Sequence, residues 1–321
     1  MPTADNLLDL FLNAIASERN AADNTIEAYR RDIQAFLLFL KQNKTTVDLK
    51  NTTESDVFDF RCALEQQNLR PASIARKLTA LRRLFDFLFH ESIIQSNPTR
   101  NIHLPKNTRP LPKILEKDEV FAVLENAAHD TTPEGRRRWL LFELLYGAGL
   151  RVSELVTLKI GNFHVNMKTR EFENDIIVKG KGGKERIIPI HETCLEALVA
   201  YLEVRHTFCA HSKRNSNSNA NKAADWLFPS SSKAGFLTRQ RVAQLLKETA
   251  ESVGLDPAKL SPHVMRHAFA THLLNGGANL LVIKKLLGHA DVATTQIYTH
   301  IQTKRLAELI KKHHPLSKNE G

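Results

Sequence analysis

Tyr298 is the residue of this chain whose neighbours best suit covalent chemistry. A phenol is a poor nucleophile at neutral pH, because its ordinary pKa is about 10. A tyrosine that attacks a phosphodiester therefore needs cations and proton acceptors around it. His263, Arg266 and His289 precede Tyr298 and supply groups of both kinds. Together the four residues predict a site that cuts a phosphodiester bond.

The pair His263 and Arg266 is spaced to act on one partner. The two residues are three apart at the start of a helix that we predict over residues 263–275, so they project from one face. An imidazole and a guanidinium can both donate to the non-bridging oxygens of a phosphate. For this pair alone, an ordinary helix start with a hydrogen-bonded histidine and a solvated arginine stays open as the alternative.

Two other motifs could suggest a metal or a nucleotide, and neither pattern is complete. His263 and His267 have zinc-helix spacing, but the metalloprotease pattern needs a glutamate directly after the first histidine, where this chain has Val264. The glycine- and lysine-rich segment 180–184 is not followed by Gly-Lys-Ser/Thr at the Walker spacing. We therefore expect no metal, no ATP and no other cofactor.

Composition limits the class of protein. The 321 residues with 42% hydrophobic content allow about two domains with a core each. A net charge of +10 suits a polyanion such as nucleic acid. The apolar runs are short and interrupted by charge, so we expect no signal peptide and no membrane span. Cys62, Cys194 and Cys209 are far apart and in no CxxC pair, which indicates a reduced, cytoplasmic protein.

The first hundred residues read as helices with basic surfaces. Apolar residues recur at helical spacing over 24–40 and again from Pro71. In the second helix Arg76, Lys77, Arg82 and Arg83 fall outside the apolar stripe, and no acidic residue lies among them. The net charge favours a phosphate-facing surface over a merely solvated one.

A basic, proline-rich stretch separates this part from the rest. Residues 92–115 hold no acid after Glu91, and four prolines alternate with basic residues that include Arg100 and Arg109. We therefore expect a helical DNA-binding domain at 1–98, a linker at 99–112 and a catalytic domain at 113–321.

The catalytic domain is predicted to be mostly helical with one small β element. Helices are expected near 116–128, 134–146 and from Val152, and later over 191–207, 238–253 and 263–275. The β-rich runs 175–178 and 186–190 flank a glycine-rich turn and predict a hairpin. Residues 210–225 read as a flexible insertion. The expected fold class is thus mainly α with a small β-sheet or hairpin in the C-terminal domain.

Six positions in this order resemble the tyrosine recombinases of the phage integrase family. They are Arg151, Lys181, His263, Arg266, His289 and Tyr298. The segments 260–275, 294–300 and 313–315 are similar to the bacterial Xer recombinases, to the XerD branch more than to the XerC branch. The resemblance covers nearly the whole chain and implies a two-domain clamp around DNA.

The resemblance also implies a mechanism. Tyr298 would attack the scissile phosphate to form a 3′-phosphotyrosyl link, while Arg151, Arg266 and His289 hold the phosphate. Lys181 would protonate the leaving 5′-oxygen and His263 would accept the tyrosine proton. Lys179 and Lys184 are rival acids in the same turn. For Arg151 the alternative is a simple ion pair with Glu154, which the resemblance makes less favoured. Glu154 would instead hold the basic residues of the site in place.

The resemblance further implies partners and a cellular task. DNA contacts are expected from Arg76, Lys77, Arg83, Arg100 and Arg109. The chain would resolve chromosome dimers at a dif-like site, in a heterotetramer with a second, XerC-like recombinase and under an FtsK-like translocase. The apolar stripe Leu306, Leu309 and Ile310 would dock on a neighbouring protomer.

Several other functions remain as alternatives. They are the XerC-type partner, a mobile-element integrase, a type IB topoisomerase and a DNA-binding or architectural protein that has lost catalysis.

Overall fold

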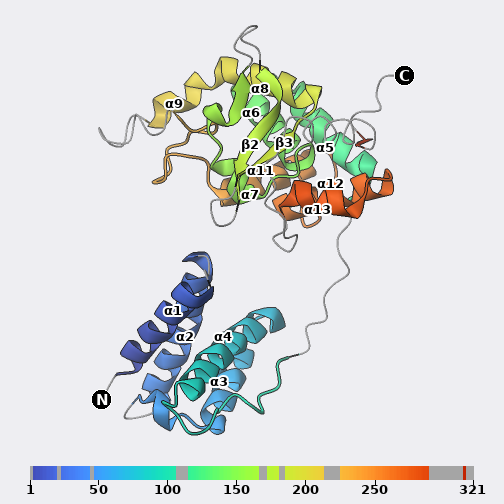
Figure 1. The fold of residues 1–321 in the computed structure, drawn as a ribbon. Helices are drawn as coiled ribbons and strands as arrows, with labels where there is room; N and C mark the ends of the chain where they lie inside the picture. Colours follow the sequence, from blue (N-terminus) through green and yellow to red (C-terminus); the bar gives the residue numbers. More distant parts are fainter. Residues whose placement is uncertain are drawn as a thin grey trace. The chain divides into compact units, whose positions relative to one another are not determined.

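The computed structural model describes residues 3–19, 23–43, 47–105, 115–165, 172–180, 185–212, 225–288 and 314–315. The chain divides into two units, Met1–Leu111 and Pro112–Gly321 (Figure 1). Each unit has its own cluster of buried hydrophobic side chains. The two units are therefore described separately.

The regular elements in the described part of the first unit are all helices. Its α-helices are α1 (Ala4–Arg19), α2 (Asp23–Asn43), α3 (Glu54–Gln66) and α4 (Pro71–His90), and a 3₁₀ turn, η1, covers Leu49–Asn51. The predicted helical spacing is confirmed, because Ile33, Phe36 and Leu40 of α2 are buried in the core of this unit. The start of α4 follows from Pro71 at its first position, where the missing N–H costs nothing.

The second unit is built around α6 (Pro133–Tyr146). Every residue from Leu140 to Tyr146 is buried, so the C-terminal half of this helix is enclosed on all sides. It packs mainly on α5 (Lys117–His129), α8 (Glu192–Val204) and α12 (Pro262–Asn275). The remaining elements are α7 (Val152–Val156), η2 (Ile160–Asn162), α9 (His206–Ser212), α11 (Arg239–Ser252) and α13 (Leu280–Leu287).

The β-sheet of the second unit has three antiparallel strands in the order β1-β2-β3. They are β1 (Phe163–Val165), β2 (Phe172–Lys179) and β3 (Glu185–Pro189). The predicted hairpin is confirmed as β2 and β3, with Ile176 opposite Ile188 and Val178 opposite Arg186. Ile176, Val178 and Ile188 are buried, so this register turns one face of the hairpin to the core.

The predicted fold class, mainly α with a small sheet, is confirmed. The predicted helix 191–207 is wrong in one detail, because α8 ends at Val204 and α9 begins at His206. Strand β1 and helix α13 were not predicted. No helix in the described ranges is both long and apolar enough to cross a membrane. Most of the predicted 210–225 insertion lies outside the described residues.

The last described residues, His314 and Pro315, are buried. The His314 ring centroid lies 4.9 Å from that of Tyr146 and 5.6 Å from that of Phe269. This end of the chain therefore packs against α6 and α12 of its own unit. Leu306, Leu309 and Ile310, predicted to dock on a neighbour, lie outside the described residues.

Candidate active site

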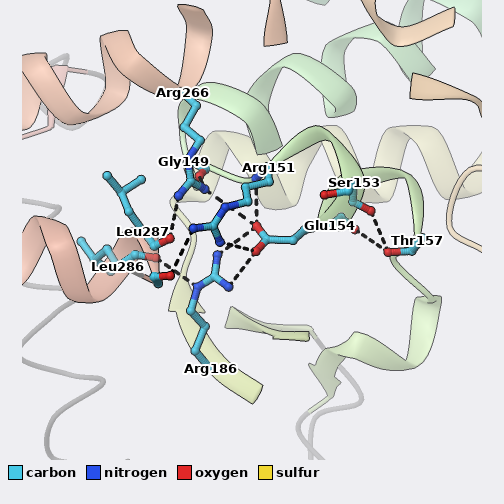
Figure 2. A network of polar contacts seen from close by, with 10 residues as sticks. Gly149, Arg151, Ser153, Glu154, Thr157, Arg186, Arg266, Leu286 and Leu287 are labelled. Carbon is cyan, nitrogen blue, oxygen red and sulfur yellow. Dashed lines mark hydrogen bonds and ion pairs between the residues drawn. The ribbon is translucent and has the colours of Figure 1, made fainter. Parts of the chain in front are cut away.

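Glu154 lies at the centre of a cluster of arginines in the second unit (Figure 2). Its carboxylate accepts a hydrogen bond from Arg151 Nη1 at 2.9 Å and two from Arg186, both at 2.9 Å. Arg266 Nη1 lies 3.8 Å from the same carboxylate, close enough for an ion pair but not for a hydrogen bond. One carboxylate thus holds three guanidinium groups from α7, β3 and α12.

The start of α7 explains why Arg151 and Glu154 meet. Arg151 is the N-cap residue, and its backbone N–H donates to Glu154 Oε2 at 2.9 Å. This bond is half of a capping box, in which the side chain at the third helical position satisfies the N-cap N–H. The contact between Arg151 and Glu154 that the sequence allowed as an alternative therefore exists. It coexists with a wider network, as the expected supporting role of Glu154 requires.

Arg266 is fixed by one backbone carbonyl from the loop before α7 and one from the end of α13. It sits one turn into α12, which begins with Ser261 as N-cap and Pro262 at its first position. Its Nη1 donates to Gly149 O and its Nη2 to Leu287 O at 2.6 Å. Burial, followed by the charge of Arg151, lowers the pKa of Arg266 to about 10. Arg266 therefore stays charged at neutral pH and is held rigidly.

The C-terminal end of α13 is bound by all three arginines. Arg186 Nε donates to Leu286 O at 3.1 Å, Arg266 to Leu287 O, and Arg151 Nη2 to Gly288 O at 3.1 Å. These are carbonyls that a helix end leaves without partners inside the helix. Positive charge is also favourable at the negative end of the helix dipole. The arginines thus fix the point at which the chain leaves α13 towards His289.

The electrostatics of this cluster suit an anion. Burial works to raise the pKa of Glu154, but hydrogen bonds and charge from Arg186, with further bonds from Arg151, outweigh it and lower that pKa. Glu154 is thus ionised, and one negative charge faces three positive ones. Arg151 keeps 37% of its side chain exposed. A partly exposed guanidinium beside surplus positive charge can bind a phosphate.

The predicted catalytic residues fall into two groups. Arg151 and Arg266 are brought together through Glu154, and His263 is exposed in the first turn of the helix that carries Arg266. Lys181, His289 and Tyr298 lie outside the described residues. So do the rival acid Lys184 and the apolar stripe of Leu306, Leu309 and Ile310. Their roles stay predictions.

Arg186 belongs to the cluster and was missed by sequence reasoning. It lies opposite Val178 on β3 and is buried. A signal for it existed, because strand side chains alternate and Arg186 shares the parity of the buried Ile188. A charged residue on the core side of a strand needs a partner, and that partner is Glu154.

The predicted DNA contacts of the first unit differ in their surroundings. Arg76 forms an ion pair with Asp32 of α2, and Lys77 Nζ lies 3.4 Å from the same buried carboxylate. Arg83 and Arg100 are exposed, whereas Arg109 lies outside the described residues. No acidic residue lies near Arg76 in the sequence, but the fold brings Asp32 into contact with it.

One group of side chains could hold a metal ion. His164, Glu173 and Asp175 on β1 and β2 offer ligand atoms within 4.8 Å of one another, and all three are half-buried. His164 already pairs with Asp175. In the part of the chain that the structure describes, no second observation points to an ion there, so the expectation of no metal stays a prediction.

Comparison with known proteins supplies the class. Residues 113–305 match the model of the Phage integrase family, and residues 8–92 match the model described as Phage integrase, N-terminal SAM-like domain. The chain is 44% identical over 309 residues to tyrosine recombinase XerD of Rickettsia bellii, covering 96% of this chain and 98% of that protein. It is 41% identical to tyrosine recombinase XerD of Caulobacter vibrioides, covering 98% and 97%.

Solved structures agree with this class. A crystal structure of the XerH site-specific recombinase bound to a palindromic difH substrate, a post-cleavage complex, is 25% identical with a TM-score of 0.64. The match covers 95% of this chain and 83% of the XerH chain. A lambda integrase dimer bound to a COC′ core site is 18% identical with a TM-score of 0.59, covers 93% and 99%, and supports the fold alone.

The chain therefore belongs to the phage integrase family, and within it to the tyrosine recombinases of the XerD type. It is accordingly an enzyme, a tyrosine site-specific recombinase.

Proposed function

We propose that Tyr298 is the nucleophile with which this recombinase cuts and rejoins DNA. Its oxygen forms a bond to the scissile phosphorus, and the bond from phosphorus to the 5′-oxygen breaks. The product is a 3′-phosphotyrosyl link and a free 5′-hydroxyl, which then attacks the phosphotyrosine of the partner strand. Because two transesterifications conserve the bond energy, the reaction needs no nucleotide.

The observation that carries this proposal is the arginine cluster around Glu154. Arg151 and Arg266 would bind the non-bridging oxygens of the phosphate, where negative charge grows in the transition state. His289 would add a hydrogen bond, Lys181 would protonate the leaving 5′-oxygen, and His263 would accept the proton of Tyr298. Preorganised donors cost little reorganisation during the reaction, and the bonds to fixed carbonyls supply that preorganisation.

A nicked suicide substrate tests the nucleophile directly. We expect the wild-type protein to form a covalent adduct on it and Tyr298→Phe to form none, with specific DNA binding in a gel shift unchanged within a few fold. The ring is kept and only the nucleophilic oxygen is removed. An adduct that persists in the phenylalanine variant would overturn the assignment. Lack of relaxation of a supercoiled plasmid without a site would separate this reaction from that of a topoisomerase.

We further propose the domain roles and the cellular task. Residues 1–98 would bind DNA, 99–112 would link and 113–321 would catalyse. The XerD names of the relatives and the difH substrate of the XerH structure support resolution of chromosome dimers at a dif-like site. The chain would then work in the cytoplasm, where chromosomal DNA lies, with a XerC-like recombinase in a heterotetramer and an FtsK-like translocase.

The partner proposal has its own test. On a plasmid with two dif-like sites, recombination should require both this protein and the second Xer recombinase of the same cell. Recombination by this protein alone would favour a single-recombinase system instead.

A further inference from the structure

Arg186 has every polar atom of its side chain committed to the protein. Its Nη1 and Nη2 form a two-pronged contact with Glu154, at 2.9 Å each, and its Nε donates to Leu286 O at 3.1 Å. Its side chain is only 8% exposed. Each nitrogen of this buried side chain already bonds to the protein, so we expect any effect of Arg186 on the reaction to pass through the groups that it holds.

The first of these groups is Glu154, for which the three arginines compete. Arg186 occupies both carboxylate oxygens, and Arg266 Nη1 remains 3.8 Å away, donating to Gly149 O instead. Arg151 already donates to Glu154 at 2.9 Å, so without the fork of Arg186 the nearest new donor to the buried carboxylate would be Arg266. A direct hydrogen bond with Glu154 would draw the Arg266 guanidinium away from a phosphate and weaken its field there.

The second group is the end of α13. Arg186 binds the first of the three successive carbonyls, those of Leu286, Leu287 and Gly288, and the other two are bound by the arginines proposed to grip the phosphate. Gly288 ends the helix with φ of 64°, and a Cβ there would lie 3.2 Å from the Arg186 guanidinium. Arg186 therefore packs directly against the residue that precedes His289.

We propose that Arg186 is a positioning residue of the recombination reaction. Its two bonds to Glu154 leave Arg266 without a direct bond to that carboxylate, and its bond to Leu286 O holds the end of α13 in register with Arg151 and Arg266. This inference rests on the proposed function of Arg151 and Arg266, whose polar contacts are drawn in Figure 2. It assigns to β3 a part in the reaction separate from the predicted general acid in the preceding turn.

The test uses Arg186→Lys in the full-length protein. Lysine keeps one positive charge beside Glu154, which limits the cost of an unpaired buried carboxylate, but it cannot form the planar two-pronged contact. The control is Arg136→Lys in the same unit, which replaces an arginine whose Nη1 donates to Glu203 and to Ala200 O of α8. Melting temperature, gel-shift affinity and single-turnover adduct formation on the suicide substrate are measured for each protein.

We expect Arg186→Lys to slow adduct formation about tenfold or more, somewhat less than loss of a direct transition-state donor. Site affinity should change by less than about threefold and the control should cleave at the wild-type rate. The double variant with Glu154→Gln should be no slower than the slower single variant, because both changes break one contact. A rate loss that only tracks melting temperature across the variants, or additive losses, would overturn the proposal.

A second substrate separates Arg186 from the predicted acid. A 5′-bridging phosphorothiolate has a leaving group that needs no proton, so it restores variants of a general acid. It should leave the defect of Arg186→Lys in place, because that defect lies in phosphate stabilisation. If the phosphorothiolate restored the full cleavage rate of Arg186→Lys, Arg186 would act through the turn that carries Lys181, and the proposal would be wrong. If the wild-type protein formed no adduct at all, the proposed function would fail instead.

Discussion

At the scale of single residues, Gly149 shows how closely the arginines proposed to bind the phosphate depend on backbone shape. Its φ is +61°, and its carbonyl accepts a hydrogen bond from Arg266. A Cβ at this position would lie 2.4 Å from Cδ1 of Phe269. The residue thus combines a left-handed conformation that favours glycine with a space that admits no side chain.

Gly149→Ala is therefore expected to lower both stability and cleavage. Left-handed backbone costs a non-glycine residue about 1–2 kcal/mol, and overlap with the Phe269 ring should add about 1–3 kcal/mol. Gly254→Ala is the control, because Gly254 has φ of +74° with no atom within 4 Å of the new Cβ. Urea unfolding and suicide-substrate cleavage compare the two. Equal losses in both variants would show that the contact with Phe269 does not matter.

At the scale of elements, the central helix α6 carries a buried acidic residue, Glu143. Glu143 is 1% exposed, and burial raises its pKa to about 7. The unfolded chain releases this proton near the ordinary value of 4.5, whereas the folded protein keeps it until about pH 7. Glu143 therefore makes the folded state less stable as pH rises through this window, and the full penalty is present above it.

Glu143→Gln should remove this pH dependence, because the amide has nearly the shape of the protonated acid and no charge. Above pH 8 the variant should be more stable than the wild type by an amount of the order of 3 kcal/mol, and near pH 4 the two should be equal. Chemical unfolding from pH 4 to 9 measures the difference. The exposed Glu251→Gln in α11 is the control. Parallel curves for wild type and Glu143→Gln would contradict the burial argument.

At the scale of the whole molecule, a net charge of +10 predicts DNA binding that weakens steeply with salt. The exposed Arg83 and Arg100 are free of the Asp32 contact that engages Arg76 and Lys77. If each covers one phosphate, substitution by alanine should reduce the slope of log affinity against log salt by about 0.9.

Arg76→Ala should change the slope less, because Asp32 already neutralises part of its charge. Gel shifts at several salt concentrations test both statements. A slope unchanged by loss of Arg83 and Arg100 would place the DNA footprint elsewhere.

The sequence by itself determined the elements and the class of chemistry. Helices α2, α4, α5, α6, α11 and α12 and the β2-β3 hairpin follow from periodicity and from local start signals, such as Pro71 and Ser261. These features depend on residues a few positions apart, so a linear pattern can report them. The spacing of His263 and Arg266, and for Arg151 the family resemblance, likewise predicted a phosphate-binding site.

Only the tertiary structure decided which charges meet. Arg186 is 32 positions from Glu154 and Asp32 is 44 positions from Arg76, yet each pair is in contact. Glu143 looked like any acid in a helix until packing on all sides buried it. The physical reason is the same in each case. Periodicity tells which face of an element is apolar, but the partner of a side chain on that face depends on how distant elements pack.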